Sequence, residues 1–225
     1  QSGRGIEGVA STAAGSPETL AALGRATDRA LAGIRTGEMP FDALAAVAAE
    51  VPLGRFPHDL LAGFALDVAG FRPETGDDLL RYCYHVAGCV GVMMALAMGV
   101  PADDHPTLAR ASDLGLSFQL GNIARDIGED AAAGRCYLPA AWLADEGLDR
   151  ANYFAAENRV RLHRVACRLV ALAGRYEESA RHGTPLLKPR QAWAVLAAAR
   201  IYGAIGRTVA AGGPAMLERR VFTST

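Results

Sequence analysis

Acidic and amide side chains recur at a regular spacing in the segment 111–139, ASDLGLSFQLGNIARDIGEDAAAGRCYLP. Asn122, Asp126 and Asp130 are four residues apart, so on a helix their oxygen atoms lie along about 12 Å of one face. Carboxylates this close repel one another unless a proton or a cation lies between them. Oxygen ligands without His or Cys favour a hard ion such as Mg²⁺, commonly shared with phosphate oxygens. The spacing predicts a site for Mg²⁺ and a diphosphate, with a solvated acidic face as the alternative.

The surroundings of this row also suit an anionic ligand. Gln119 and Glu129 share its arc of the helix, and an apolar arc adjoins it. Arg125 and Arg135 are close in sequence, and arginine pairs well with phosphate oxygens. The polar row is therefore expected to border the buried face of a long helix.

A second unusual segment is YCYHVAGCVG at residues 82–91. Gly88 and Gly91 lie inside an expected helix, where each costs about 1 kcal/mol relative to alanine. Close packing of two helices would offset this cost. An elongated apolar ligand lying against small residues is the other explanation.

The composition favours an all-helical protein in which these segments are placed. Alanine, the strongest helix former, contributes 45 of the 225 residues, and β-branched residues are few. Apolar residues make up 51%, enough for a buried core, and the net charge of −1 argues against a nucleic-acid partner. Capping signals and apolar periodicity predict helices over 17–34, 40–51, 57–70, 77–99, 106–130, 139–146, 150–183 and 188–211. Their short connections indicate a single-domain bundle over 16–225, after a flexible lead of residues 1–15.

Several other site and segment types are not expected. Residues 3–8 match G-x-G-x-x-G, but no strand precedes them, so no nicotinamide cofactor is expected. The apolar run Val86–Ala102 contains glycines and a proline and is shorter than the roughly 20 residues that cross a bilayer, so no transmembrane helix is expected. The four cysteines lack a C-x-x-C pattern, which predicts reduced thiols and a cytoplasmic location.

Taken together, the motifs resemble the squalene/phytoene synthase family, and within it the bacterial phytoene synthases. The resemblance rests on NIARDIGED at 122–130, GRCYLP at 134–139 and YCYHVAGCVG at 82–91. It extends from about Ser16 through GFALD at 63–67 to LERRVF at 217–222. It implies an all-α isoprenoid synthase fold with a central hydrophobic channel.

The resemblance also implies a reaction, the head-to-head joining of two geranylgeranyl diphosphates to phytoene through a cyclopropyl diphosphate, in carotenoid biosynthesis. It implies Mg²⁺, with Mn²⁺ as an alternative ion, as the cofactor that assists ionisation of the diphosphate. The chemistry suits such residues, because metal ions and arginines stabilise a leaving diphosphate. An apolar pocket with aromatic faces keeps carbocations away from water.

By position, the resemblance implies a role for each matching residue. Metal ligands are implied at Asn122, Asp126 and Asp130. A catalytic role is also implied for Asp126 and Asp130, and a place near the reacting carbons for Tyr137. Substrate contacts are implied at Gln119, Arg125, Tyr82, Val86, Ala87, Val90, Gly91, Gly115, Phe118, Tyr202 and Arg220. For Tyr137 and Tyr202 a core tyrosine is the alternative, and for Arg220 a surface arginine.

One part of the family pattern has no counterpart. The family carries a first aspartate-rich motif, D-x-x-x-D, upstream of the others, and Asp28 has no acid four residues further on. We therefore expect the N-terminal helices of the family, with half of the metal site, to be absent. The chain is then either a fragment, which Gln1 favours, or a protein that lost them. This puts the activity of the chain alone in question.

Alternatives remain for function and for partners. A squalene or dehydrosqualene synthase would use farnesyl diphosphate, and a non-catalytic member of the family would be a helical binding or assembly protein. Four arginines recur on one face of an expected helix, Arg161, Arg164, Arg168 and Arg175. They indicate either a solvated face or a peripheral contact with anionic lipid. The oligomeric state is left open.

Overall fold

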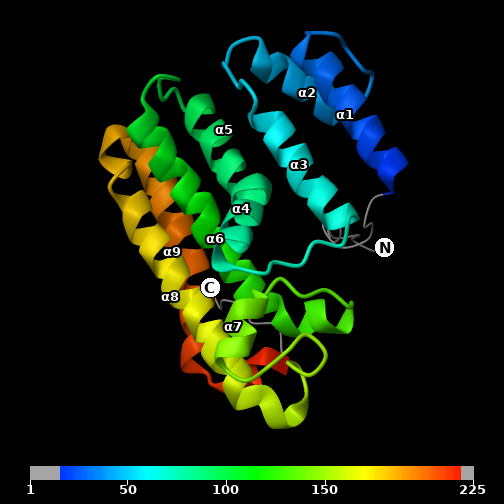
Figure 1. Ribbon diagram of the computed structural model, residues 1–225. Coiled ribbons are helices and arrows are strands. Elements are labelled where there is room, and N and C mark those ends of the chain that lie inside the picture. Colours follow the sequence, from blue (N-terminus) through cyan, green and yellow to red (C-terminus); the bar gives the residue numbers. More distant parts are fainter. Residues whose placement is uncertain (1–15, 219–225) are drawn as a thin grey trace, which may run out of the picture.

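The computed structural model describes residues 16–218, and every regular element in that range is helical (Figure 1). The α-helices are α1 (Pro17–Leu31), α2 (Met39–Ala48), α3 (Phe56–Val68), α4 (Gly76–Cys83), α5 (Cys89–Ala97), α6 (His105–Ala132), α7 (Ala140–Asp145), α8 (Arg159–Arg181) and α9 (Pro189–Ala211). Shorter helical turns are η1 (Tyr84–Gly88), η2 (Ala156–Asn158), η3 (Thr184–Leu186) and η4 (Pro214–Glu218). The all-α prediction is confirmed. The expected flexible lead, residues 1–15, lies outside the described residues.

Side-chain caps explain where several helices begin. The Ser16 hydroxyl accepts the backbone N–H of Thr19 at 3.2 Å, and an Asp104 carboxylate oxygen accepts that of Thr107 at 3.2 Å. Thr75 and Asp78 form a reciprocal capping box at the start of α4. These bonds satisfy N–H groups that have no partner within the helix.

One predicted helix is shorter than expected. The stretch 150–183 was expected to be a single helix, but α8 begins only at Arg159. The Asp149 carboxylate accepts the backbone N–H groups of Ala151 and Asn152 at 2.8 and 2.9 Å. Asn158 in turn donates to the Asn152 carbonyl at 2.8 Å. Short polar side chains thus supply these backbone groups with partners outside a helix, which delays the start of α8.

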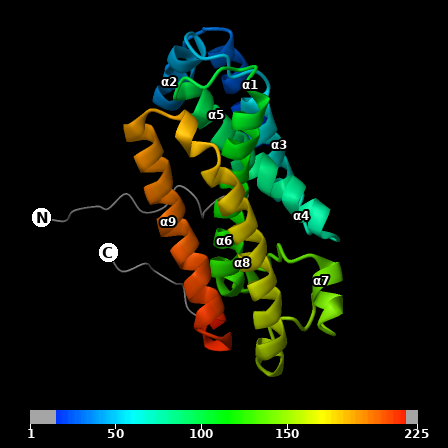
Figure 2. The ribbon, with the colours of Figure 1, turned by 90° about the vertical axis from the view of Figure 1, so that its left-hand side faces the viewer.

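The long helix α6 is the centre of the bundle. It packs against α8, α5 and α9, and Figure 2 shows α8 and α9 running beside it. In both views α1 and α2 lie at one end of the bundle. The main core lies between α6 and α8 and includes the buried side chains Leu120, Ile123, Ile127, Leu162, Val165 and Leu169. Burial of this face against α8 sets the orientation of α6, and with it the direction of the polar row.

Glycines bring α6 unusually close to the helix formed by α4, η1 and α5. A Cβ atom on Gly91 would lie 2.2 Å from the Ala111 carbonyl oxygen, and one on Gly115 would lie 2.2 Å from that of Ala87. At Gly88 the nearest atom, on Leu116, would be 2.6 Å away. Of the two explanations for the helical glycines, close packing is therefore supported. The contact includes η1, a π-helical turn of a type often found at functional sites.

The arginine row on α8 contacts the neighbouring helix α7. Arg164 pairs with Glu146 and Arg168 with Asp145, each at 2.7 Å. The Arg168 guanidinium also lies 4.2 Å from the centre of the Trp142 ring. These contacts hold α7 against α8 and give two of the four arginines a structural role. A lipid contact of this face stays a prediction.

Within the part of the chain that the structure describes, two helical stretches are long and apolar enough to cross a membrane, by length and composition alone. They are Gly76–Ala97, with 44% of the apolar window buried, and Pro189–Ala211, with 22% buried. Core helices of soluble proteins meet the same criterion. The expected lack of a transmembrane helix therefore stays a prediction.

Candidate functional site

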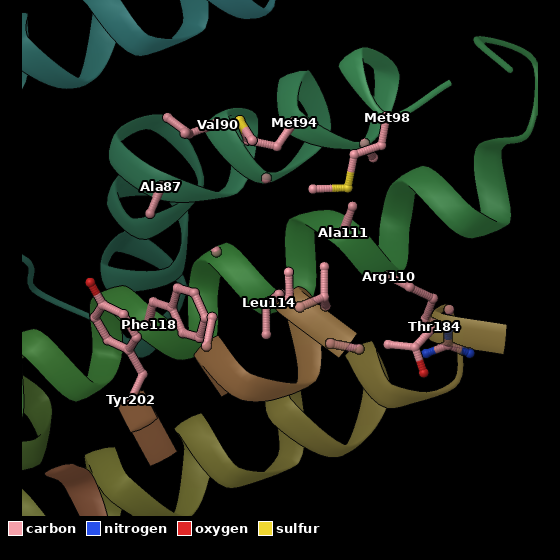
Figure 3. Close-up of a pocket in the computed structure, with 18 of the residues that line it drawn as sticks. Ala87, Val90, Met94, Met98, Arg110, Ala111, Leu114, Phe118, Thr184 and Tyr202 are labelled. Carbon is pink, nitrogen blue, oxygen red and sulfur yellow. The ribbon is translucent and has the colours of Figure 1, made fainter. Parts of the chain in front are cut away.

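A largely apolar cavity of about 480 Å³ lies between α5, α6 and α9 (Figure 3). Nine of the residues predicted to contact substrate or metal line it: Val86, Ala87, Val90, Gly91, Gly115, Phe118, Gln119, Asn122 and Tyr202. They come from η1, α5, α6 and α9, so the fold gathers segments that are more than 100 residues apart. The volume is in the range of small-molecule sites.

The cavity follows the length of α6. Its lining residues on that helix run from Thr107 to Asn122, about 22 Å at 1.5 Å per residue. At the Asn122 end the rings of Phe118 and Tyr202 stack, with their centres 4.1 Å apart. Figure 3 shows Met98 and Thr184 towards the opposite end. The cavity is thus an elongated, largely apolar slot, with the amide groups of Gln119 and Asn122 at one end and the polar side chains Arg110 and Thr184 at the other.

The acidic row continues from that end along α6. Asp126 accepts two hydrogen bonds from Arg125, at 2.6 Å from Nε and 2.5 Å from Nη2. Asp130 accepts one from Arg135 at 3.0 Å. Burial raises the pKa of the Asp130 carboxyl above its ordinary value, and the hydrogen bond from Arg135 opposes this shift. Both carboxylates are therefore hydrogen-bonded to a guanidinium group.

The donor chemistry of the row fits a hard divalent ion. Asn122, Asp126 and Asp130 offer one amide oxygen and two carboxylates on successive turns of α6. Among residues 16–218, no group of three or more His, Cys, Asp or Glu side chains is placed to hold a metal ion. An ion at this row would therefore need further oxygen ligands, as Mg²⁺ has when it is shared with phosphate groups. Glu129, on the same helix, is exposed.

Two predicted tyrosines lie outside the large cavity. The hydroxyl groups of Tyr82 and Tyr137 both donate to Asp67 Oδ1 at 2.9 Å, and their rings stack with centres 5.0 Å apart. Tyr82 is buried in the core, and Phe71 stacks on its other face. Burial raises the pKa of both hydroxyls, that of Tyr137 to about 12. The two tyrosines form one hydrogen-bonded group with a carboxylate from α3.

The predicted set and the cavity lining differ at several residues. Arg125, Asp126, Asp130 and Tyr137 do not line the large cavity, and Arg220 lies outside the described residues. The sequence did not reveal the other cavity residues, among them Met94, Met98, Arg110 and Leu114, and it pointed to Asp67 only as part of a longer motif. Met94 and Met98 continue the four-residue spacing that begins at Val90, a signal that could have revealed them.

Comparison with known proteins identifies the family of the chain. A family model described as squalene/phytoene synthase matches residues 6–225. The chain is 57% identical to the 15-cis-phytoene synthase of Enterobacter agglomerans over 77% of its own length, and it spans 58% of that relative. It is 50% identical to the phytoene synthase of Pseudescherichia vulneris, covering 96% of this chain and 71% of the relative.

A solved structure supports the fold as well. The squalene synthase HpnC from Alicyclobacillus acidocaldarius superposes with a TM-score of 0.79 at 25% identity, over 87% of this chain and 74% of the other. The isoprenoid synthase type of helical bundle that was expected is therefore confirmed. With a family model that matches nearly its whole length, the chain belongs to the squalene/phytoene synthase family.

Proposed function

We propose that this chain forms part of a phytoene synthase, which joins two geranylgeranyl diphosphates head-to-head to give phytoene for carotenoid biosynthesis. The carrying observation is the apolar slot along α6 that ends at Gln119 and Asn122 and continues into the row Asp126 and Asp130. A long hydrocarbon chain with a charged diphosphate head matches that sequence of environments. Two relatives named phytoene synthase, at 57% and 50% identity, support the same reaction.

The length of the slot favours the longer of the two candidate substrates. Each isoprene unit adds four chain bonds, about 5 Å when extended. Four units of a geranylgeranyl chain then need about 20 Å and three units of a farnesyl chain about 15 Å. The lining of α6 from Thr107 to Asn122 extends over about 22 Å. A geranylgeranyl chain would occupy the slot, whereas a farnesyl chain would leave its Thr107 end empty.

The residues of the site have separable tasks in this reaction. Asn122, Asp126 and Asp130 would hold Mg²⁺, which when bound neutralises charge on the diphosphate as it leaves. Arg125 and Arg135 lie beside the two carboxylates and can pair with phosphate oxygens. The apolar walls exclude water from a carbocation, and the stacked faces of Phe118 and Tyr202 offer negative π density to it.

Product analysis tests the proposal. The full-length protein that contains this chain is incubated with Mg²⁺ and radiolabelled geranylgeranyl diphosphate, and in parallel with farnesyl diphosphate, and the extracted hydrocarbons are identified. We expect phytoene from the first substrate. A product from farnesyl diphosphate alone would replace the substrate with the shorter one. No labelled hydrocarbon from either would contradict the proposed activity and favour a non-catalytic role.

A matched pair of variants links the product to the site. Asp126→Asn keeps the size of the side chain and removes its charge, so product formation should be lost. Glu178→Gln makes the same change at an exposed position on α8 and should leave product formation unchanged. Equal activity of the two variants would contradict the role given to the acidic row.

A further inference from the structure

Three segments converge on the carboxylate of Asp67. Asp67 lies in the last turn of α3, Tyr82 lies in α4, and Tyr137 lies in the loop between α6 and α7. Oδ1 accepts both tyrosine hydroxyls at 2.9 Å, and Oδ2 accepts Tyr82 a second time at 3.2 Å. One half-buried carboxylate thus holds two hydroxyl groups that are 55 residues apart in the sequence.

This geometry fixes the direction of both hydroxyl groups. A tyrosine hydroxyl has one proton, and here both protons are donated to Asp67, so only the oxygen lone pairs remain for another partner. Hydrogen bonds to an ionised carboxylate are about twice as strong as neutral ones. Stacking of the two rings, and of Phe71 on Tyr82, restricts rotation of the side chains. Without Asp67 both hydroxyls would need new partners.

The group formed by Asp67, Tyr82 and Tyr137 also adjoins the acidic row. Tyr137, Asp130 and Arg135 line one small cavity, together with Ile123 and Ile127 of α6. Asp130 and Arg135 are hydrogen-bonded to each other there. A displacement of the Tyr137 ring would therefore change the surroundings of Asp130 and Arg135, where the diphosphate is expected to bind.

We propose that Asp67 is a positioning residue for the reaction. Its carboxylate orients the Tyr137 hydroxyl beside the acidic row, and it also holds Tyr82, whose ring stacks on that of Tyr137. Asp67 does not line the large cavity, so it acts through the two tyrosines rather than by contact with the substrate. The expected effect on kcat rests on the proposed function, whereas the orientation of the two tyrosines by Asp67 can be tested without it.

Kinetics of single and combined variants test the consequence. Asp67→Ala should lower kcat about a hundredfold, the effect of displacing a reacting group by about an ångström. KM for the diphosphate should change little, and Asp67→Asn, which keeps one acceptor oxygen, should lose less. In a chain that carries Tyr82→Phe and Tyr137→Phe, Asp67→Ala should cause no further loss. An undiminished loss in that background, or a rise in KM with kcat unchanged, would overturn the proposal.

A matched control separates positioning from stability. Asp59, also on α3, accepts the Tyr84 hydroxyl at 2.6 Å, in a second aspartate–tyrosine pair, neither residue of which lines the large cavity or the small one beside Asp130. Asp59→Asn and Asp67→Asn should lower the melting temperature to a similar extent, but only Asp67→Asn should lower kcat. Equal effects of the two variants on kcat would contradict the positioning role and leave Asp67 with a structural role only.

A spectroscopic measurement tests the geometry without turnover. In protein labelled with ¹³C at tyrosine Cζ, Asp67→Asn should shift the resonances of Tyr82 and Tyr137, assigned with the phenylalanine variants, and leave that of Tyr84 in place. Unmoved resonances would overturn the proposal whatever the activity. If the resonances move but the unmodified full-length protein makes no product from either diphosphate, the proposed function fails and the positioning geometry stands.

Discussion

The close approach of α6 to the α4–η1–α5 helix can be tested by adding one methyl group. A Cβ on Gly115 would lie 2.2 Å from the Ala87 carbonyl oxygen, 2.6 Å from the Ala87 carbonyl carbon and 2.9 Å from Gly88 Cα. Ordinary contact begins at 3.4 Å, so the nearest pair is too close by 3.4 − 2.2, or 1.2 Å. All three atoms belong to backbone, which cannot rotate away. Gly115→Ala must therefore push two packed helices apart.

The expected cost follows from two opposing terms. Overpacking in a core costs typically 1–3 kcal/mol, and rigid backbone on the opposing side places Gly115→Ala near about 3 kcal/mol. Alanine gains about 1 kcal/mol over glycine inside a helix. The net loss is about 2 kcal/mol, which corresponds to a fall of about 4–8 °C in the melting temperature of a domain this size.

Another buried glycine of the same helix supplies the control. The nearest atom to a Cβ on Gly121 would be the Tyr202 carbonyl oxygen at 3.9 Å, an ordinary contact. Gly121→Ala should therefore gain about 1 kcal/mol from helix propensity alone. Thermal unfolding followed by circular dichroism measures both variants. A Gly115→Ala protein as stable as the unmodified chain, or an equal fall for Gly121→Ala, would refute the packing argument.

Three further outcomes are expected. Glu177→Gln removes a buried charge that pairs with Arg181 and Arg207 at 2.6 and 3.4 Å, so the free energy of unfolding in urea should fall by about 2 kcal/mol. Glu178→Gln, at an exposed position, should change this free energy little. Equal losses for the two variants would argue against the pairing. Because burial raises the pKa of Tyr137 to about 12, the folded state retains that proton more tightly than the unfolded chain does. Stability should therefore fall as the pH rises from about 10 through 12, and Tyr137→Phe should flatten that fall in urea titrations at several pH values; an unchanged slope would contradict it. Removal of divalent ions with EDTA should abolish product formation and added Mg²⁺ should restore it, whereas activity that is insensitive to EDTA would exclude the proposed ion site.

The features that the sequence predicted well are local ones. The regular spacing of Asn122, Asp126 and Asp130 depends only on the turn of a single helix, and α6 has that helix. The same holds for the start of α1, where Ser16 caps the backbone a few residues away as the sequence predicts. The late start of α8 was missed because Asp149 and Asn158 bond to backbone in a way that helix periodicity does not reveal.

The role of the glycines needed the tertiary structure. By sequence, Gly91, like Gly88, is consistent with packing or with an apolar ligand, because a missing side chain leaves room for either. The structure places backbone of the neighbouring helix within reach of Gly91 and of Gly115, and both glycines also line the cavity. The same residues therefore bring two helices together and shape the slot between them.

The amino-acid sequence by itself determined the all-α class, the order of the helices and the polar row on α6, because each depends on the spacing of residues within one helix. Only the tertiary structure showed that Asp67 receives the hydroxyls of Tyr82 and Tyr137, and that Met98 and Thr184 line the same slot as Phe118. These residues lie on different elements, and the distance between them is set by how the whole bundle packs. No periodicity along the chain encodes that distance.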